Sequence, residues 1–392
     1  MTPVIHAIGA SLWMSFSMFW EILWPLILGF GISAVIQAVV SKKQMARLLG
    51  DARPKTLIVA CGLGAASSSC SYAAVAIARS LFRKGANFTA AMAFELASTN
   101  LVIELGVIMI VLMGWRFAAA EFAGGFLMVA ILALLFRRFL SPGLVDESLT
   151  QAERGIAGRM EGHAEMDMSV TEGNLRERIS SKKGVTAISH YFVMDWVSVW
   201  KDIAIGLLLA GAAATWIPQS VWQGFFFASH PTLAKVWGPL IGPLVSVVSF
   251  VCSVGNVPLA AVLWNGGISF GGVIAFIYAD LIVLPILNIY RKYYGRRMMA
   301  FLFVTFYAAM AMAALGIELI FQLLGLVPAE RHATVAPSHI SFDYTTLLNA
   351  VLLVVAALLI FRFFRTRGPS MLRMMEQQKP SRDHRHAAEH QH

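Results

Sequence analysis

The chain has 392 residues, of which 58% are hydrophobic and only 14% charged, and its mean hydropathy is +0.68. Soluble domains are about 25% charged and 45–50% apolar, so this composition excludes a disulfide-rich secreted scaffold, a disordered chain and almost any soluble enzyme. It predicts an all-α integral membrane protein. The net charge of +9 then belongs to loops that orient the chain in the bilayer, and no nucleic-acid partner is expected.

Seven segments are apolar over about the 20 residues that a membrane-spanning helix requires. In chain order they are 13–40, 88–113, 117–136, 197–217, 268–290, 298–325 and 345–364. The N-terminus has no basic residue before its apolar stretch, so it is interpreted as the beginning of the first span rather than as a cleaved signal.

Two further apolar regions are interrupted. Residues 56–82 are split by Gly62, Gly64 and a run of three serines, and residues 237–264 are split around 252–258. Each half is too short to cross the bilayer, and small polar residues are typical of the break in a re-entrant helix. Both regions are predicted to be hairpins that enter and leave the membrane on the same side.

The distribution of Lys and Arg favours this topology. With both hairpins and an outside N-terminus, 17 basic residues fall in short inside segments and three fall outside; if both regions cross, the counts are 15 and five. The positive-inside rule therefore favours the hairpins. We expect a multi-pass protein of the cell inner (plasma) membrane with a cytoplasmic C-terminus.

Five regions of the chain are expected to differ in character. They are a first membrane repeat (1–140), a cytoplasmic linker loop (141–196), a second membrane repeat (197–325), an extra-cytoplasmic loop with the last span (326–367), and a basic, His-containing cytoplasmic tail (368–392).

An offset of 182 residues aligns the two membrane halves without a gap. Ten of the 32 positions from 70 to 101 are then identical, including Cys70 with Cys252 and Gly85 with Gly267. In the hairpin topology the two copies enter from opposite sides, which makes them inverted repeats. Paired interrupted segments in two such halves are typical of a transporter whose substrate site lies near the bilayer midplane.

Cysteines lie at the two breaks. Cys70 and Cys252 would approach each other across the pseudo-two-fold axis, and Cys61 lies in the other arm of the first hairpin. Thiolates select soft ions, so these residues could bind a trivalent metalloid or a soft metal. Buried free cysteines also serve simply as small apolar residues, and that alternative stays open.

Hydroxyl and amide groups near the breaks are further candidates for substrate contact. Helix packing and interhelical hydrogen bonds explain such groups equally well. The candidates are Ser67, Ser68, Ser69, Ser71, Ser98, Thr99 and Asn100 in the first half and Ser253 and Asn256 in the second.

Ionisable side chains inside a membrane are costly and usually functional. Asp280 is the repeat partner of Ser98, and Glu95 lies one helical turn from Ser98. Glu95 and Asp280 are therefore candidates for proton coupling, with a structural ion pair to Arg79 as the alternative. Glu21 and Glu318 are interpreted as packing or interfacial residues.

The linker contains Met160, His163, Met166 and Met168, whose soft ligands could form a weak metal site. A solvated loop with incidental methionines is the alternative. No nucleotide-binding or hydrolase motif is present, so neither a cofactor nor enzymatic activity is expected.

A resemblance to a known family is carried by residues 61–72, 78–86 and 93–100 in the first half and by 252–258 and 266–280 in the second. The sequence resembles the predicted-permease family that includes the ArsP-type organoarsenical permeases and the YraQ-like proteins. The resemblance covers both membrane halves. It implies a permease, with efflux of trivalent organoarsenicals known for some members, and it carries a substrate role only to Cys70 and Cys252.

These patterns predict about seven spans and two hairpins that work by alternating access as a secondary transporter. The expected cargo is a small thiophilic metalloid or metal species, exported with the proton gradient. Two alternatives are a permease for a small sulfur-containing or other anion, and a non-transporting membrane scaffold or sensor. The expected partners are the substrate and the bilayer, and assembly into a homo-oligomer is left open.

Overall fold

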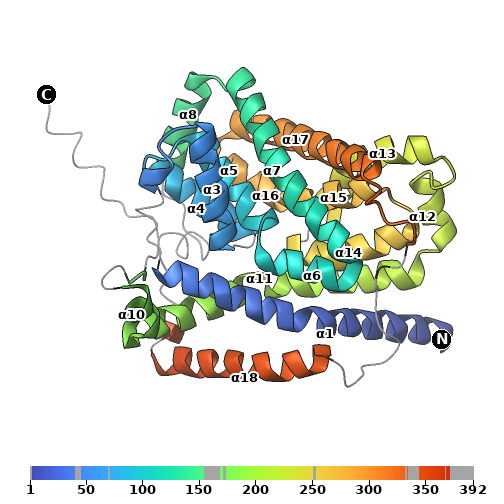
Figure 1. Ribbon diagram of the computed structural model, residues 1–392, viewed down its shortest axis with the longest axis horizontal. Helices are drawn as coiled ribbons and strands as arrows, with labels where there is room; N and C mark the ends of the chain where they lie inside the picture. Colours follow the sequence, from blue (N-terminus) through green and yellow to red (C-terminus); the bar gives the residue numbers. More distant parts are fainter. Residues whose placement is uncertain are drawn as a thin grey trace, which may run out of the picture.

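The computed structural model describes residues 2–39, 46–68, 71–153, 168–170, 174–249, 253–331, 333, 344–366 and 368–370. Within these ranges all regular structure is helical (Figure 1). The helices of the first half are α1 (Thr2–Val39), α3 (Pro54–Ser67), α4 (Ser71–Arg83), α5 (Phe88–Asn100), α6 (Ile103–Met113), α7 (Trp115–Phe139) and α8 (Pro142–Glu153).

The remaining helices follow the linker. They are α10 (Leu175–Ser180), α11 (Lys182–Trp216), α12 (Gln219–Phe225), α13 (Pro231–Ser249), α14 (Ser253–Gly266), α15 (Phe270–Tyr278), the 3₁₀ turn η1 (Ala279–Ile282), α16 (Leu284–Tyr294), α17 (Arg296–Leu323) and α18 (Tyr344–Arg365).

Six of the seven predicted spans have counterparts in helices that are long and apolar enough to cross a membrane. Five are His6–Val39, Phe88–Met113, Trp115–Phe139, Arg296–Leu323 and Thr345–Arg365. The second of these consists of α5 followed by α6, with Leu101 and Val102 between them. The sixth is the pair Phe270–Ile282 and Leu284–Tyr294, which is bent by 42°. The seventh predicted span lies in α11, where the described apolar stretch is Ile203–Trp216.

The first interrupted region is broken where the sequence indicates. In the second, residues 250–252 lie outside the described part of the chain, and 253–258, most of the predicted break, is helical. In the first half α3 ends at Ser67 and α4 begins at Ser71, and in the second half α13 ends at Ser249 and α14 begins at Ser253. Helices α3 and α4 are each about 20 Å long at 1.5 Å per residue, which is too short to cross a hydrocarbon core of about 30 Å.

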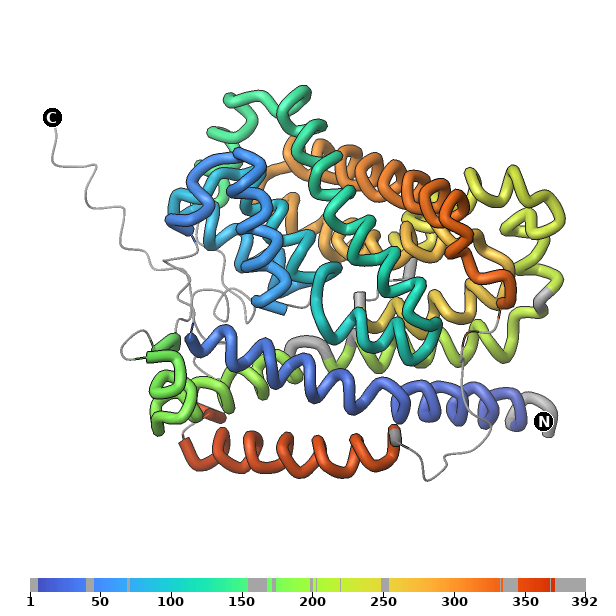
Figure 2. Tube along the Cα trace, in the orientation of Figure 1, coloured from blue at the N-terminus to red at the C-terminus, as the bar shows by residue number. Residues whose placement is uncertain are grey.

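Three helices form a layer along one side of the molecule. Figures 1 and 2 show α1, α11 and α18 side by side, and these three helices contact one another. The short helix α10 lies at one end of this layer, and the other helices are gathered on the opposite side of α1 and α11. Only 17% of the most apolar window of α18 is buried, so the bilayer would cover most of this helix. Helices α1 and α11 also contact the inner bundle, through α6 and α14.

Contacts within the two halves follow the same pattern. Helix α3 contacts α5 as α13 contacts α15, and α4 contacts α5 as α14 contacts α15. Across the halves, α4 contacts α16 while α14 contacts α6, and α7 contacts α17. These pairings agree with the 182-residue sequence repeat.

Glycines mark equivalent turns in the two halves. Gly85 and Gly267 have φ values of +96° and +113° at the turns after α4 and α14. Gly114 and Gly295, at +95° and +91°, separate α6 from α7 and α16 from α17. Residues with a Cβ atom rarely adopt such values. The repeat pairs Gly85 with Gly267 directly, and it places Gly114 one residue out of register with Gly295.

The predicted linker, 141–196, contains more regular structure than the sequence indicates. It holds α8 and α10, and α11 begins inside it at Lys182. The Ser181 hydroxyl caps α11 by accepting the N–H of Gly184 at 3.0 Å, and an Asn174–Glu177 capping box begins α10. Helix α8 packs against α16, α4 and α17, so this segment covers one end of the inner bundle.

Candidate functional site

The end of α3 is held by α1. Ser68 has a left-handed backbone (φ 36°) and donates its N–H to the Gly64 carbonyl at 3.2 Å, which ends the helix. The Ser33 hydroxyl of α1 donates to the carbonyls of Ser67 and Ser68 at 2.8 and 3.1 Å. The Ser68 hydroxyl in turn donates to Glu104 of α6. The broken end is therefore bound to two other helices.

The two cysteines predicted at the breaks, Cys70 and Cys252, lie outside the described residues, as does Ser69. Ser253 begins α14, but its side chain is not among those described. Substrate and metal binding at these four positions therefore stays a prediction.

The beginning of α4 is joined to the second half of the chain. Ser71 is the first residue of α4, and its hydroxyl donates to Oδ2 of Asp280 at 2.5 Å. Asp280 lies in η1, between α15 and α16, and its exposed fraction is 0%. A serine from one break thus meets an acid from the opposite repeat in the protein interior.

Two more buried carboxyl groups lie near Asp280. Glu95 of α5 accepts a hydrogen bond from the Tyr290 hydroxyl of α16, and its charge interacts with that of Asp280. Glu121 of α7 also interacts electrostatically with Asp280. We call Glu95, Glu121 and Asp280 the carboxyl centre; all three have an exposed fraction of 0%.

Glu121 was missed by the sequence analysis. Both of its carboxyl oxygens lack a hydrogen-bond partner within the described part of the chain, and so does Oε2 of Glu95. Tyr278 approaches the same turn of α7 and donates its hydroxyl to the Glu121 carbonyl at 2.8 Å. A Cβ atom on Gly124 would collide with that hydroxyl, so glycine makes room for Tyr278 here.

The polar end of α5 mostly bonds to its own helix. The Ser98 and Thr99 hydroxyls donate to the Glu95 and Leu96 carbonyls at 2.8 and 3.2 Å. Asn100 donates to the Leu96 carbonyl at 3.2 Å, and its Oδ1 has no partner among the described residues. These contacts fit the packing alternative for the two hydroxyls and leave one amide oxygen available.

Other predicted residues have structural partners. Asn256 of α14 donates to the Ser246 hydroxyl of α13 at 3.2 Å. Glu21 accepts from the Thr345 hydroxyl at 3.2 Å, which joins α1 to α18. Glu318 of α17 accepts the N–H of Gly271 at the first turn of α15. The contacts of both glutamates agree with the packing role predicted for them.

Arg79 of α4 is buried against α8. Its Nε and Nη2 donate to the Ala152 carbonyl at 3.1 and 2.6 Å, and its guanidinium carbon lies 4.4 Å from the centre of the Tyr293 ring. Its exposed fraction is only 4%. Arg79 therefore ties α4 to α8 and α16, and its part in proton coupling stays a prediction.

A second arginine makes similar contacts in the segment after α17. Arg331 donates to the carbonyls of Trp264 and Ile268 at 2.9 and 2.7 Å, and it lies 4.4 Å from the Trp264 ring centre. Burial lowers the pKa of the Arg331 guanidinium, and the carboxylate of Glu318 opposes that shift. Arg331 ties the turn between α14 and α15 to this segment.

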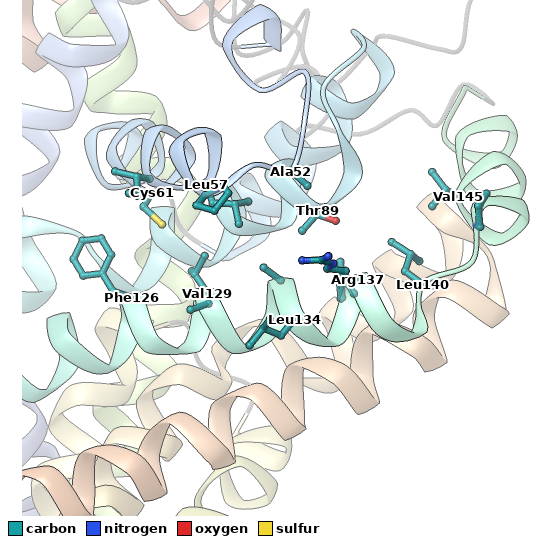
Figure 3. Close-up of a pocket in the computed structure, with 16 residues that line it drawn as sticks. Ala52, Leu57, Cys61, Thr89, Phe126, Val129, Leu134, Arg137, Leu140 and Val145 are labelled. Carbon is teal, nitrogen blue, oxygen red and sulfur yellow. The ribbon is translucent and has the colours of Figure 1, made fainter.

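Cys61 faces a different part of the molecule. Figure 3 shows its sulfur directed from α3 toward α7, into an apolar groove that Leu57, Phe126 and Val129 also line. The thiol is free and buried. The structure therefore places Cys61 in the wall of a groove between α3 and α7.

Within the described residues, no group of three or more His, Cys, Asp or Glu side chains is placed to hold a metal ion. Met160, His163 and Met166 lie outside those residues. Met168 is described, and its N–H donates to the Tyr191 hydroxyl at 2.9 Å. The weak loop site stays a prediction.

Comparison with known proteins identifies the family of this chain. Residues 8–319 match the family model ArsP_1, which is described as a predicted permease. The chain belongs to this permease family. It is also 61% identical over 338 residues to Rv2963 of Mycobacterium tuberculosis, which is named as a permease; the match covers 86% of this chain and 83% of the relative. No solved structure matches the chain.

The family match covers both halves of the permease, from α1 to α17. It includes both breaks, the carboxyl centre and the groove beside Cys61. It confirms the predicted family and agrees with a transporter rather than an enzyme. Residues 1–7 and the chain beyond residue 319, which includes α18, lie outside the matched region.

Proposed function

We propose that this permease exports a small thiophilic metalloid or metal species across the cell inner membrane by alternating access, driven by the proton gradient. The observation that carries the proposal is the buried hydrogen bond from Ser71 to Asp280. It places an ionisable group of one repeat at the break of the other, which is where a transporter couples its driving ion to its gates.

The helix pattern supports alternating access. Two halves with equivalent breaks, equivalent glycine turns and reciprocal contacts are what a pair of inverted repeats requires. In such transporters one repeat or bundle moves against the other around a central site. The α4–α16 and α14–α6 contacts would then change together, because each joins one half to the other.

The carboxyl centre supports proton coupling. Several carboxylates in a low-dielectric interior repel one another and lose hydration, so they share protons instead of all remaining ionised. Asp280 accepts the Ser71 hydroxyl and also interacts electrostatically with Glu95 and Glu121. Protonation of Asp280 would alter its bond to the first break, which would link proton binding to movement of α4.

The predicted cysteines support a thiophilic cargo. Cys70 directly precedes α4 and Cys252 directly precedes α14, so each belongs to the break of its own repeat. Soft thiolates favour soft cations and metalloids. Three carboxyl groups at the centre would repel an anionic cargo, so we favour a neutral or cationic thiophilic species over the anion alternative.

The test is growth of a metalloid-sensitive host that expresses the permease on arsenite, methylarsenite, copper or zinc salts. Wild-type permease should raise tolerance to at least one of these compounds, and Cys70→Ala and Cys252→Ala should abolish that gain. Cys61→Ala is the matched control and should keep it, since Cys61 lines the separate groove. Equal tolerance with all three variants would remove the thiolate hypothesis, and no gain with any compound would remove the proposed cargo.

A further inference from the structure

The groove beside Cys61 is large and almost wholly apolar. Its volume is about 630 Å³, which is within the usual range of roughly 300–1,000 Å³ for a small-molecule site. It runs between α3 and α7 to the beginning of α8. The lining residues that matter for the argument are Ile58, Cys61, Phe126, Ala130, Leu134 and Arg137.

The groove opens toward the outside of the helix bundle. Ile58, Phe126 and Leu134 are exposed over 67%, 52% and 65% of their surface. In a membrane protein, large apolar side chains exposed in this way on spanning helices face lipid. The groove can therefore be entered sideways from the bilayer, without passing through the carboxyl centre.

One end of the groove carries a positive charge without an acidic partner. Arg137, in the last turn of α7, is exposed and lines the groove, and no residue in the described part of the chain forms an ion pair or hydrogen bond with its guanidinium. Figure 3 shows Arg137 in the groove near Thr89. The neighbouring Arg138 instead stacks on Phe139, 5.3 Å from the ring centre, and does not line the groove.

The charges around this end are also mainly basic. Arg53 and Lys55 flank the first residue of α3, beside the groove wall formed by Ala52 and Pro54. Arg53 is partly neutralised by Asp51 at 3.4 Å. The local field therefore favours a negatively charged group next to Arg137.

We propose that this groove is a binding site for one anionic phospholipid. Its phosphate contacts the Arg137 guanidinium, which suits phosphate because its planar N–H groups can bond two oxygens. An acyl chain lies along the apolar wall toward Phe126. Basic pockets between membrane helices are recognised sites for anionic lipid head groups. The inference concerns a site separate from the transport pathway and holds whatever species is carried.

The experiment is native mass spectrometry of the delipidated permease in detergent, titrated with palmitoyl-oleoyl phosphatidylglycerol or with the matching phosphatidylcholine. Wild-type protein should form a first phosphatidylglycerol adduct at a lower lipid concentration than the phosphatidylcholine adduct. Arg137→Gln should weaken that adduct about fivefold, which corresponds to one basic contact, and should remove the preference. Arg138→Gln is the matched control and should bind as the wild type does.

A second pair of variants tests the chain-binding part of the groove. Ala130→Trp places a large side chain in the groove from an exposed position, whereas Ala123→Trp makes the same change at an exposed position of α7 that does not line it. Only Ala130→Trp should weaken the adduct. Equal affinity for the two lipids, equal effects of the two arginine variants, or equal effects of the two tryptophan variants would overturn the proposal.

Discussion

The Ser71 hydroxyl and Oδ2 of Asp280 are 2.5 Å apart although the two residues are separated by 209 positions in the chain. Ser71 is exposed over 1% of its surface and Asp280 over none of it. One residue begins the helix after the first break, and the other belongs to the turn that interrupts the second repeat. This bond therefore connects the two halves of the permease at the centre of the proposed coupling mechanism.

Loss of this bond should reduce stability. Ser71→Ala removes a buried donor to Asp280, and we expect the free energy of unfolding to fall by about 1–3 kcal/mol. Thermal unfolding in detergent would measure the change. Ser98→Ala is the control, because that hydroxyl bonds only to the Glu95 carbonyl within its own helix among the described contacts. Equal losses of unfolding free energy in the two variants would contradict the expectation that the bond between the halves stabilises the protein more than a bond within one helix.

Glu121 should matter for coupling but not for stability. Its carboxyl oxygens have no described hydrogen-bond partner, so Glu121→Gln removes a titratable group without breaking a bond, and the unfolding midpoint should stay close to that of the wild type. The dependence of transport rate on pH should flatten. Tyr290→Phe provides the contrast: it leaves Glu95 without its donor and should cost about 1–3 kcal/mol. A large loss of stability in Glu121→Gln would contradict the expectation that this carboxyl group does not stabilise the fold.

The crossing of α3 over α5 depends on one glycine. A Cβ atom on Gly64 would collide with the Phe94 carbonyl and the Ala97 side chain, whereas one on Gly62 would meet nothing within 4 Å. Gly64→Ala should destabilise the protein by about 1–3 kcal/mol, as overpacking does. Gly62→Ala should instead raise stability by about 0.5–1 kcal/mol, because alanine favours the helix. Unfolding curves of the two variants measure both changes. Equal stabilities of Gly64→Ala and Gly62→Ala would contradict the close approach of α3 to α5 at Gly64.

The two arginine contacts should control access at opposite ends. Arg331→Gln removes the donors to Trp264 and Ile268, so a cysteine introduced at Gly266 should react faster with an impermeant maleimide added outside. Arg79→Gln removes the tie to α8 and should instead speed labelling of a cysteine at Gly85 from the inside. Both measurements require a background without native cysteines. Equal acceleration at both positions by either variant would contradict two separate closures.

The sequence predicts the broken helices well because the cause is local. Small polar residues around Ser67 and Ser71 cannot continue a buried apolar helix without other partners, and the helices end and begin there. The repeat is equally visible because matched glycines are needed at matched turns. Six of the predicted spans have counterparts for a similar reason: their length and apolarity are properties of the segment itself.

The carboxyl centre is harder to predict because it depends on distant contacts. Glu121 lies inside an apolar span with no break beside it. Only the packing of α7 against α15 brings it near Tyr278 and Asp280. The one available signal was its position as an acid within the predicted span 117–136. Likewise, nothing local to Arg79 indicates that α8 will fold over it and supply the Ala152 carbonyl.

Proton-driven transport in proteoliposomes tests the central claim most directly. The permease would be reconstituted, an imposed pH difference would drive methylarsenite movement, and wild type would be compared with Asp280→Asn, which keeps the shape of the side chain but cannot carry a proton. We predict gradient-driven accumulation by the wild type, its loss in Asp280→Asn, and retained exchange of substrate without a gradient in that variant. Accumulation by Asp280→Asn equal to that of the wild type, with the same pH dependence, would contradict proton coupling through Asp280.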